Sequence, residues 1–93
     1  MLYEIIIEAE ALVDLKSIFS YITEQDSKAQ ALKFTNKLKE QIETLTKMPQ
    51  RCRQSIYVSD ENTHDFIVSG YTIVFQIRDM KLHVLTVFRQ RAY

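Results

Sequence analysis

The spacing of apolar residues changes once in the first third of the chain. Residues 3–8 are rich in β-branched side chains, which predicts a short strand. From about Ala9 the apolar residues recur at spacings of three and four, which predicts an amphipathic helix of roughly four turns. Its apolar stripe consists of Leu12, Leu15, Ile18, Phe19 and Ile22. Residues 23–26 interrupt the stripe, so we expect the helix to end there.

A second amphipathic helix follows this interruption. Ser27 and Gln30 have the spacing of a capping box, in which side chains bond the free N–H groups at a helix start. Pro49 ends the helix, because proline cannot continue the hydrogen-bonded ladder. The apolar stripe consists of Ala31, Phe34, Leu38, Ile42 and Leu45. Two such helices joined by a few residues are expected to form an antiparallel hairpin with a shared apolar face.

The pattern after Pro49 is typical of strands. Gly70, the only glycine, is expected in a turn or a bulge, because glycine adopts backbone angles that other residues resist. The last segment is apolar on both faces, so we expect it inside the sheet rather than at an edge. The predicted strands cover residues 55–59 (the weakest pattern), 64–69, 71–78 and 81–89.

The order of elements is therefore β-α-α-β-β-β, with one further strand if the weak segment pairs. This order predicts an α+β fold in which a helical hairpin packs on one face of a small, mainly antiparallel sheet. Ninety-three residues are the size of one domain, so we assign residues 1–93 to a single domain. A domain of this size has little stability to spare, so a partner that covers apolar surface matters to it.

Composition and charge narrow the possible settings of this domain. Twelve Lys and Arg balance twelve Asp and Glu, which argues against a protein that coats nucleic acid by bulk electrostatics. Cys52 stands alone, which excludes an internal disulfide and fits a reducing compartment. No apolar run approaches the roughly 18 residues of a membrane span, and the first residues have no basic region of a signal peptide. We therefore expect a cytoplasmic protein without a membrane partner.

The order of the elements and several residue sets together resemble the RelE/ParE toxin family. The first helix contains Asp14-Leu15-x-x-Ile18-x-x-Tyr21-Ile22, which is similar to the family's D-L-x-x-I-x-x-Y-I stretch. Tyr71-x-Ile73-x-Phe75 resembles its Y-x-I-x-Y strand, and Val84-Leu85-x-Val87-Phe88-Arg89-Gln90-Arg91 resembles its closing I-L-x-V-x-H-x-R. The resemblance covers nearly the whole chain in the right order, and it is the ordered set that is specific.

Three departures from the family pattern fall on its catalytic subset and leave the fold prediction unaffected. The family often has glycine soon after the proline that ends the second helix, whereas Pro49 is followed by Gln50-Arg51-Cys52-Arg53. His64 stands where the family commonly has arginine, and Arg89 where it commonly has histidine. The closing motif and the neutral net charge favour the ParE branch over the RelE branch.

Resemblance to the ParE branch implies a toxin that inhibits DNA gyrase by protein contact and blocks replication, without catalysis or a cofactor. It also implies neutralisation by a co-expressed antitoxin, ParD-like or other, whose C-terminal segment wraps the toxin. Direct DNA binding is expected only through the antitoxin complex. The alternative is a ribosome-dependent mRNA endonuclease of the RelE type, and a third hypothesis is a non-toxic member that only binds its antitoxin.

Arginines near the end of the chain are the candidate target-binding residues. The loop after the second helix and the end of the last strand are expected to lie together and to form one compact positive site, which would bind phosphate or an acidic protein surface. Solvated arginines with ordinary salt bridges are the plain alternative, and the resemblance tips the balance because it places activity near the C-terminus. The candidates are Arg51, Arg53, Arg89, Arg91 and Tyr93.

The candidate antitoxin-binding residues are apolar members of the two helical stripes, which one small sheet is not expected to cover completely. They are Leu12, Leu15, Phe19, Phe34 and Leu38.

Residues that would support other chemistry form no pattern. A ribonuclease needs positioned proton carriers, and the conceivable ones are His64, His83, Tyr57, Tyr71 and Tyr93. Neither histidine matches a catalytic motif of the family. One cysteine and two distant histidines have no metal-ligand spacing, so we expect neither a metal site nor a catalytic residue. Arg51 and Arg53 flank Cys52, a setting that is expected to favour its thiolate, although we expect a bystander rather than a reactive residue.

Overall fold

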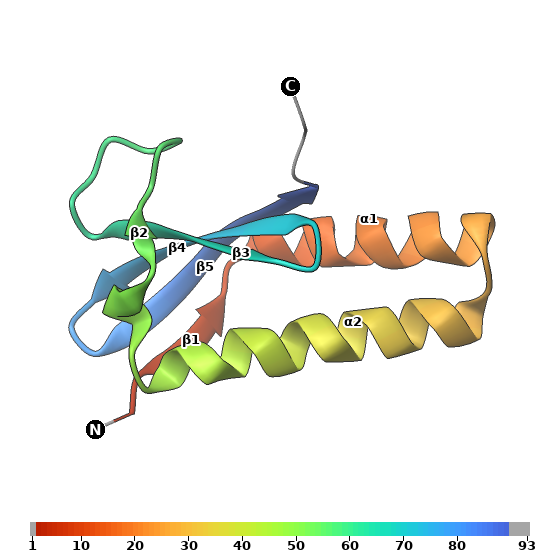
Figure 1. Ribbon diagram of the computed structural model, residues 1–93, viewed down its shortest axis with the longest axis horizontal. Coiled ribbons are helices and arrows are strands. Elements are labelled where there is room, and N and C mark those ends of the chain that lie inside the picture. Colours follow the sequence, from red (N-terminus) through yellow and green to blue (C-terminus); the bar gives the residue numbers. More distant parts are fainter. Residues whose placement is uncertain (1, 90–93) are drawn as a thin grey trace.

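The chain folds into two helices and a five-stranded sheet (Figure 1). The computed structural model describes residues 2–89. The elements are β1 (Glu4–Ile7), α1 (Ala9–Gln25), α2 (Lys28–Glu43), two 3-10 turns η1 (Thr44–Thr46) and η2 (Pro49–Arg51), β2 (Arg53–Gln54), β3 (Thr63–Val68), β4 (Tyr71–Arg78) and β5 (Lys81–Arg89). The predicted α+β class and order of elements are confirmed.

The strands lie in the order β1-β5-β4-β3-β2. The β1 strand pairs with β5 in parallel, and the three other pairs are antiparallel, so the sheet is mainly antiparallel as predicted. The β5 strand lies between β1 and β4, which agrees with its two apolar faces. The weak strand predicted at residues 55–59 is wrong: only Arg53–Gln54 pair with β3, and residues 55–62 form a loop.

The two helices form the predicted antiparallel hairpin. Ser27 begins α2, because its hydroxyl oxygen accepts the backbone N–H of Gln30 at 3.1 Å. Both helices lie on the same side of the sheet, and their connecting turn projects beyond its end (Figure 1). The apolar stripes meet the sheet in one core, whose buried members include Leu15, Ile18, Leu38, Ile42, Ile73, Phe75, Leu82, Val84 and Val87.

Two tight turns join the last three strands. Ser69 and Gly70 connect β3 to β4 with φ angles of 53° and 81°, which confirms the predicted turn at the glycine. Asp79 and Met80 connect β4 to β5 with φ angles of 48° and 63°. Positive φ at both central residues is the geometry of two-residue hairpins, because its twist matches that of the strands.

The sheet face opposite the helices is also covered. Ile73 and Phe75 face the helices, so the alternation along β4 directs Thr72 and Val74 to the other face. Both are nevertheless at most 1% exposed. The covering segment is the loop 55–62, which bonds back to β3 through the Ser55 N–H and the Thr63 carbonyl at 2.8 Å.

Within residues 2–89, no helix is both long and apolar enough to cross a membrane.

Candidate functional site

The structure separates the arginines that the sequence led us to expect in one compact site. Arg51 lies on the helix side of the sheet, where its guanidinium carbon is 5.9 Å from the centre of the Phe66 ring. The same guanidinium donates to the Thr44 hydroxyl at 3.2 Å. Arg51 is therefore held against the end of the helical hairpin.

Arg53 lies on the opposite side of the sheet, although only one residue separates it from Arg51. It pairs with Asp65, with 3.4 Å between guanidinium nitrogen and carboxylate oxygen. The Asp65 side chain is fully buried, and its Oδ2 also accepts the backbone N–H of Ile56 at 3.1 Å. Arg53 thus helps to neutralise a buried carboxylate that holds the loop 55–62 on the sheet.

Arg89 is distant from both. Arg53 is opposite Asp65, Asp65 opposite Val74, and Val74 opposite Thr86, so three strand spacings (roughly 14 Å) separate Arg53 from the middle of β5. Arg89 lies three residues farther along β5, at its end. The expectation of one compact arginine site is therefore wrong for Arg51, Arg53 and Arg89, because strand order places two of them at one sheet edge and the third inside the sheet.

Two of the candidate target-binding residues, Arg91 and Tyr93, lie outside the described residues.

Arg89 instead lines a half-open cleft between α1 and the end of the sheet. We call this cleft of about 310 Å³ the Arg89 groove, and its lining residues include Ser17, Ile18, Tyr21, Tyr71, Val87 and Arg89. Ile18 and Val87 are buried core residues. Tyr21 is 48% exposed, and the Tyr71 ring packs 5.4 Å from the Phe34 ring. The groove thus combines two tyrosines and one arginine with apolar core residues.

Asp14 holds the two sides of the Arg89 groove together. Its Oδ2 accepts the Thr86 hydroxyl at 2.6 Å and the Val87 N–H at 3.0 Å. Both donors belong to β5 and lie two and three residues before Arg89, whereas Asp14 lies on α1 one turn before Ser17. This aspartate begins the first resemblance motif, and the structure shows that it fixes β5 against α1.

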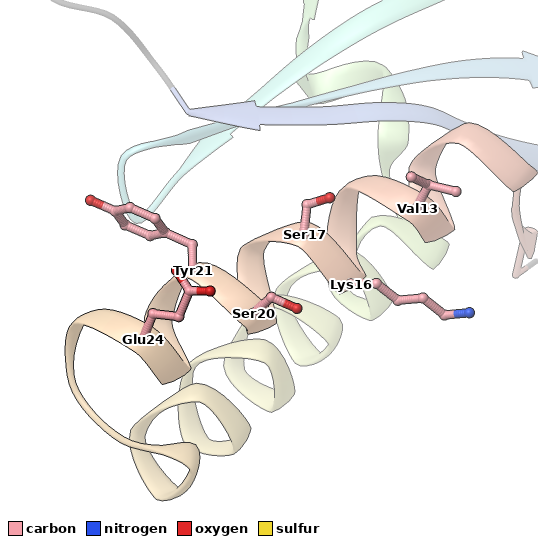
Figure 2. A pocket seen from close by; sticks show the side chains of 6 residues that line it. All are labelled: Val13, Lys16, Ser17, Ser20, Tyr21 and Glu24. Carbon is pink, nitrogen blue, oxygen red and sulfur yellow. The ribbon is translucent and has the colours of Figure 1, made fainter.

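A second cleft continues from the Arg89 groove along the outer surface of α1. It measures about 410 Å³ and shares Ser17 and Tyr21 with the groove. Both shared side chains extend towards the side of α1 on which β5 lies (Figure 2). The remaining lining residues are Val13, Lys16, Ser20 and Glu24. The two clefts therefore form a continuous surface along α1.

The candidate antitoxin-binding residues divide into buried and accessible ones. Leu15 and Leu38 are core residues with 7% and 0% exposure, so a partner cannot cover much of either. Phe19 and Phe34 are half-buried, and Phe34 packs on Tyr71. Leu12 is 47% exposed. One sheet and two helices thus bury more of the stripes than we expected, because each helix packs on both the sheet and its partner helix.

Leu12 lines a third cleft beside the edge strand β1. This β1 groove measures about 390 Å³ and is lined by Ile5, Ile7, Leu12, Leu15 and Ile42, with Lys39 and Glu43. Beside it, β1 pairs only with β5, so its outer edge has no neighbouring strand among residues 2–89. An apolar cleft next to an unpaired strand edge is a surface that a partner segment can cover.

Both histidines make hydrogen bonds within the fold. The Nδ1–H of His64 donates to the Cys52 carbonyl at 3.1 Å, and the His64 ring stacks on Phe75 at 5.6 Å. The Nδ1–H of His83 donates to Glu8 at 2.7 Å. These contacts connect β3 to the segment before β2, and β5 to the start of α1.

The expectation that two arginines favour the Cys52 thiolate is wrong. Burial raises the pKa of the half-buried Cys52 thiol, and this effect exceeds the opposing effect of Arg51. Arg53 has its own buried partner on the other side of the sheet. The protonated thiol is therefore favoured over the thiolate.

The sequence had not indicated the partners of Arg89 in its groove. Tyr21 and Tyr71 were part of the resemblance motifs, yet no spacing rule relates a residue of the first helix to one of the last strands. The buried carboxylate of Asp65 was also missed. The one indication in the sequence was that Asp65 lies within the alternating pattern of residues 64–69, at a position that the strand buries.

Comparison with known proteins identifies the family. The family model described as "ParE toxin of type II toxin-antitoxin system, parDE" matches residues 5–92. No curated protein matches the chain. Among solved structures, a chain of the chromosomal ParDE toxin–antitoxin system from P. aeruginosa superimposes with a TM-score of 0.83 at 14% identity, covering 97% of this chain and 98% of that one.

A second solved structure has the same fold. A chain of the toxin–antitoxin complex RelBE2 from Mycobacterium tuberculosis superimposes with a TM-score of 0.63 at 17% identity, covering 97% of this chain and 100% of that one. At such low identities the two structures show the fold alone, whereas the family model matches nearly the whole chain. The chain therefore belongs to the ParE toxin family of type II toxin–antitoxin systems.

Proposed function

We propose that this type II toxin arrests growth by binding DNA gyrase through protein contact, without a catalytic step of its own. The observation that carries the proposal is the match of the ParE family model over residues 5–92. The composition of the Arg89 groove supports it, because tyrosine and arginine are enriched among the residues that dominate protein–protein binding. The proposed place of action is the cytoplasm.

Target binding is assigned to the end of β5, with Arg89 in its groove and with Arg91 and Tyr93 following it in the chain. Arg53 and Arg51 are weaker candidates for the same role, because each is already held by contacts within the fold. Arg53 pairs with buried Asp65, and Arg51 packs on Phe66.

The proposed partner that neutralises the toxin is a cognate antitoxin, ParD-like or other. The two solved structures that resemble this chain come from toxin–antitoxin systems, which supports such a partner. We assign the antitoxin contact to the β1 groove, because Leu12 and Ile7 remain 47% and 36% exposed there beside the unpaired edge of β1. A segment that inserts apolar side chains into this groove would cover both. Phe19 and Phe34 are half-buried and would need a larger contact.

The alternative is an mRNA endonuclease of the RelE type, which the similarity to the RelBE2 fold keeps open. Such an enzyme needs a proton carrier beside a bound phosphate. His64 and His83 both make hydrogen bonds within the fold, and neither lines the Arg89 groove. Tyr71 does line the groove beside Arg89 and is a conceivable proton carrier, so only the positions of the two histidines count against the endonuclease.

The test is pulse expression of the chain with and without its co-expressed antitoxin, with separate measurement of DNA and protein synthesis. We expect DNA synthesis to fail first, an induced DNA-damage response, and rescue by the antitoxin. Early collapse of protein synthesis with cuts at defined mRNA codons would replace the proposal with the endonuclease. Unimpaired growth at full expression of the folded chain would identify a non-toxic member of the family.

A further inference from the structure

Arg89 is the unbalanced charge of the surface formed by the two joined clefts. Lys16 and Glu24 both line the α1 cleft and oppose each other in sign. Asp14 is near, but its Oδ2 already accepts two hydrogen bonds from β5. Among residues 2–89, no carboxylate lies within 4.0 Å of the Arg89 guanidinium. Within residues 2–89, the joined clefts therefore present one cation without an anionic partner.

The surroundings of Arg89 would strengthen an ion pair between its guanidinium and a carboxylate of a partner. Buried Ile18 and Val87 and the two tyrosine rings replace water beside the groove. An ion pair that is partly shielded from water is stronger than one on an open surface. The Asp14 bonds to Thr86 and Val87 hold the backbone before Arg89, so the guanidinium is presented from a fixed position. The Ser17 hydroxyl in the same groove supplies a further donor for an oxygen atom.

We infer that the Arg89 groove is a socket for a carboxylate-bearing segment of the toxin's protein target, an inference that rests on the proposed function. An Asp or Glu side chain of the target accepts two parallel N–H bonds from Arg89. An adjacent apolar group of the target lies between Tyr21 and Tyr71. A carboxylate matches the planar fork of a guanidinium, and tyrosine rings provide large contact areas at little entropic cost.

A protein segment suits this groove better than nucleic acid. Binding to nucleic acid draws its affinity from several phosphate contacts, each made by a cation. The Arg89 groove and the adjoining cleft together contain two cations, and Glu24 opposes one of them. One carboxylate can pair with Arg89 while one apolar group packs between the tyrosines. A chain of phosphates would be repelled by the carboxylate of Glu24.

The test combines a growth assay with direct binding for the parent chain and five variants. Arg89→Ala, Arg89→Lys and Tyr21→Ala change the groove. Arg78→Ala and Leu32→Ala are matched controls, because Arg78 is an exposed arginine at the opposite end of the hairpin β4–β5 and Leu32 is 48% exposed on α2. Each is assayed for binding to purified intact DNA gyrase, to the antitoxin and to a single-stranded RNA of about twenty nucleotides. A thermal melt checks that each variant is folded.

We expect Arg89→Ala to weaken gyrase binding about thirtyfold and Tyr21→Ala about tenfold, with growth arrest falling in the same order. Arg89→Lys should fall between parent and Arg89→Ala, because lysine keeps the charge but loses the fork. The two controls should bind gyrase like the parent. All variants should bind the antitoxin like the parent, because no residue lining the Arg89 groove also lines the β1 groove.

Several outcomes would contradict the inference. Parent-like gyrase binding and growth arrest by folded Arg89→Ala and Tyr21→Ala would remove the groove from the target site. RNA binding that Arg89→Ala abolishes would assign the groove to nucleic acid. If the parent arrests growth without binding gyrase, the proposed function is overturned. The growth assay of the variants then still decides whether the groove contributes to toxicity. A parent that neither arrests growth nor binds gyrase overturns both the proposed function and the role of the groove.

Discussion

The two faces of the sheet are buried by different means. The helix face is covered by Leu15, Ile18, Leu38 and other aliphatic side chains that close a core around Phe75. On the opposite face, Val74 is buried together with the polar residues Thr63, Asp65 and Thr72, and a loop without regular structure covers them. One face is thus buried by apolar area and the other largely by polar contacts.

The apolar residues of that loop remain largely exposed. Ser55 Oγ accepts the N–H groups of Tyr57 and Val58 at 3.1 and 3.2 Å, and Asp65 accepts that of Ile56. The backbone therefore uses the inner side for hydrogen bonds and leaves Ile56, Tyr57 and Val58 exposed. The Tyr57 ring alone finds an aromatic partner, Phe88, at 5.0 Å.

The difference shows that a buried surface need not be an apolar one. Apolar burial is non-directional, so the helix face tolerates small shifts, whereas the loop face depends on donors and acceptors in defined places. The loop face also leaves two buried oxygens, Asp65 Oδ1 and Thr72 Oγ1, without a hydrogen-bond partner among residues 2–89. Such atoms cost about 1–3 kcal/mol each. We expect the loop face to be the less stable of the two.

The largest expected effect breaks the helix face. Leu38→Ala removes a fully buried side chain of the core. We expect the free energy of unfolding to fall by about 3 kcal/mol, because lost transfer energy and a residual cavity add. Urea titration measures this loss, and Leu32→Ala, at a 48% exposed site on the same helix, is the control with little change. A loss below about 1 kcal/mol would mean that the core collapses to fill the cavity.

An intermediate effect breaks the loop face. Asp65→Ala leaves the Ile56 N–H without its acceptor and Arg53 without its partner. We expect a loss of about 2 kcal/mol and faster hydrogen exchange at the Ile56 amide. Asp65→Asn keeps an acceptor oxygen and should retain more protection than Asp65→Ala. Unchanged exchange at Ile56 in a folded Asp65→Ala protein would show that the loop is held by other contacts.

The smallest expected effect is a pH dependence of stability that comes from Asp60 in the loop. Asp60 lies at the far end of the loop, and the N–H of Asn62, followed by the amide of Gln76, lowers the pKa of its carboxyl. The folded chain therefore favours the carboxylate, so its stabilising contribution is present above the unfolded pKa. The contribution is lost as the pH falls below about 4 and through the lower folded value.

Melting temperatures between pH 2 and 7 test this dependence. The parent should lose stability at the acid end more steeply than Asp60→Asn, which cannot titrate at this position. Glu61→Gln, at the exposed neighbouring position, should keep the steep profile of the parent. Identical acid profiles for the parent and Asp60→Asn would exclude Asp60 as a source of acid sensitivity.

The difference between the faces also explains which predictions were confirmed. The apolar stripes of α1 and α2 and the two-sided β5 repeat at the periods of helix and strand, and these elements appeared where expected. Only the end of α2 differs: the helix ends at Glu43, before Pro49, and Leu45 lies in the 3-10 turn η1. The apolar residues of the loop 55–62 recur at neither the helix nor the strand period. The three consecutive residues Ile56, Tyr57 and Val58 are of types common in strands, which led to the wrong prediction at residues 55–59. A segment held by side-chain acceptors gives no repeating signal.

The sequence by itself determined both helices, every strand except β2, their order, the hairpin on one sheet face and the toxin family, because periodicity and ordered motifs are local properties of a chain. Only the tertiary structure decided which functional residues meet. Strand order placed Arg53 at a sheet edge, Arg51 on the helix side and Arg89 at the end of an inner strand. The helix-to-strand contact through Asp14 then brought Tyr21 and Arg89 into one groove. Such neighbours depend on three-dimensional packing between segments more than sixty residues apart, which no local pattern encodes.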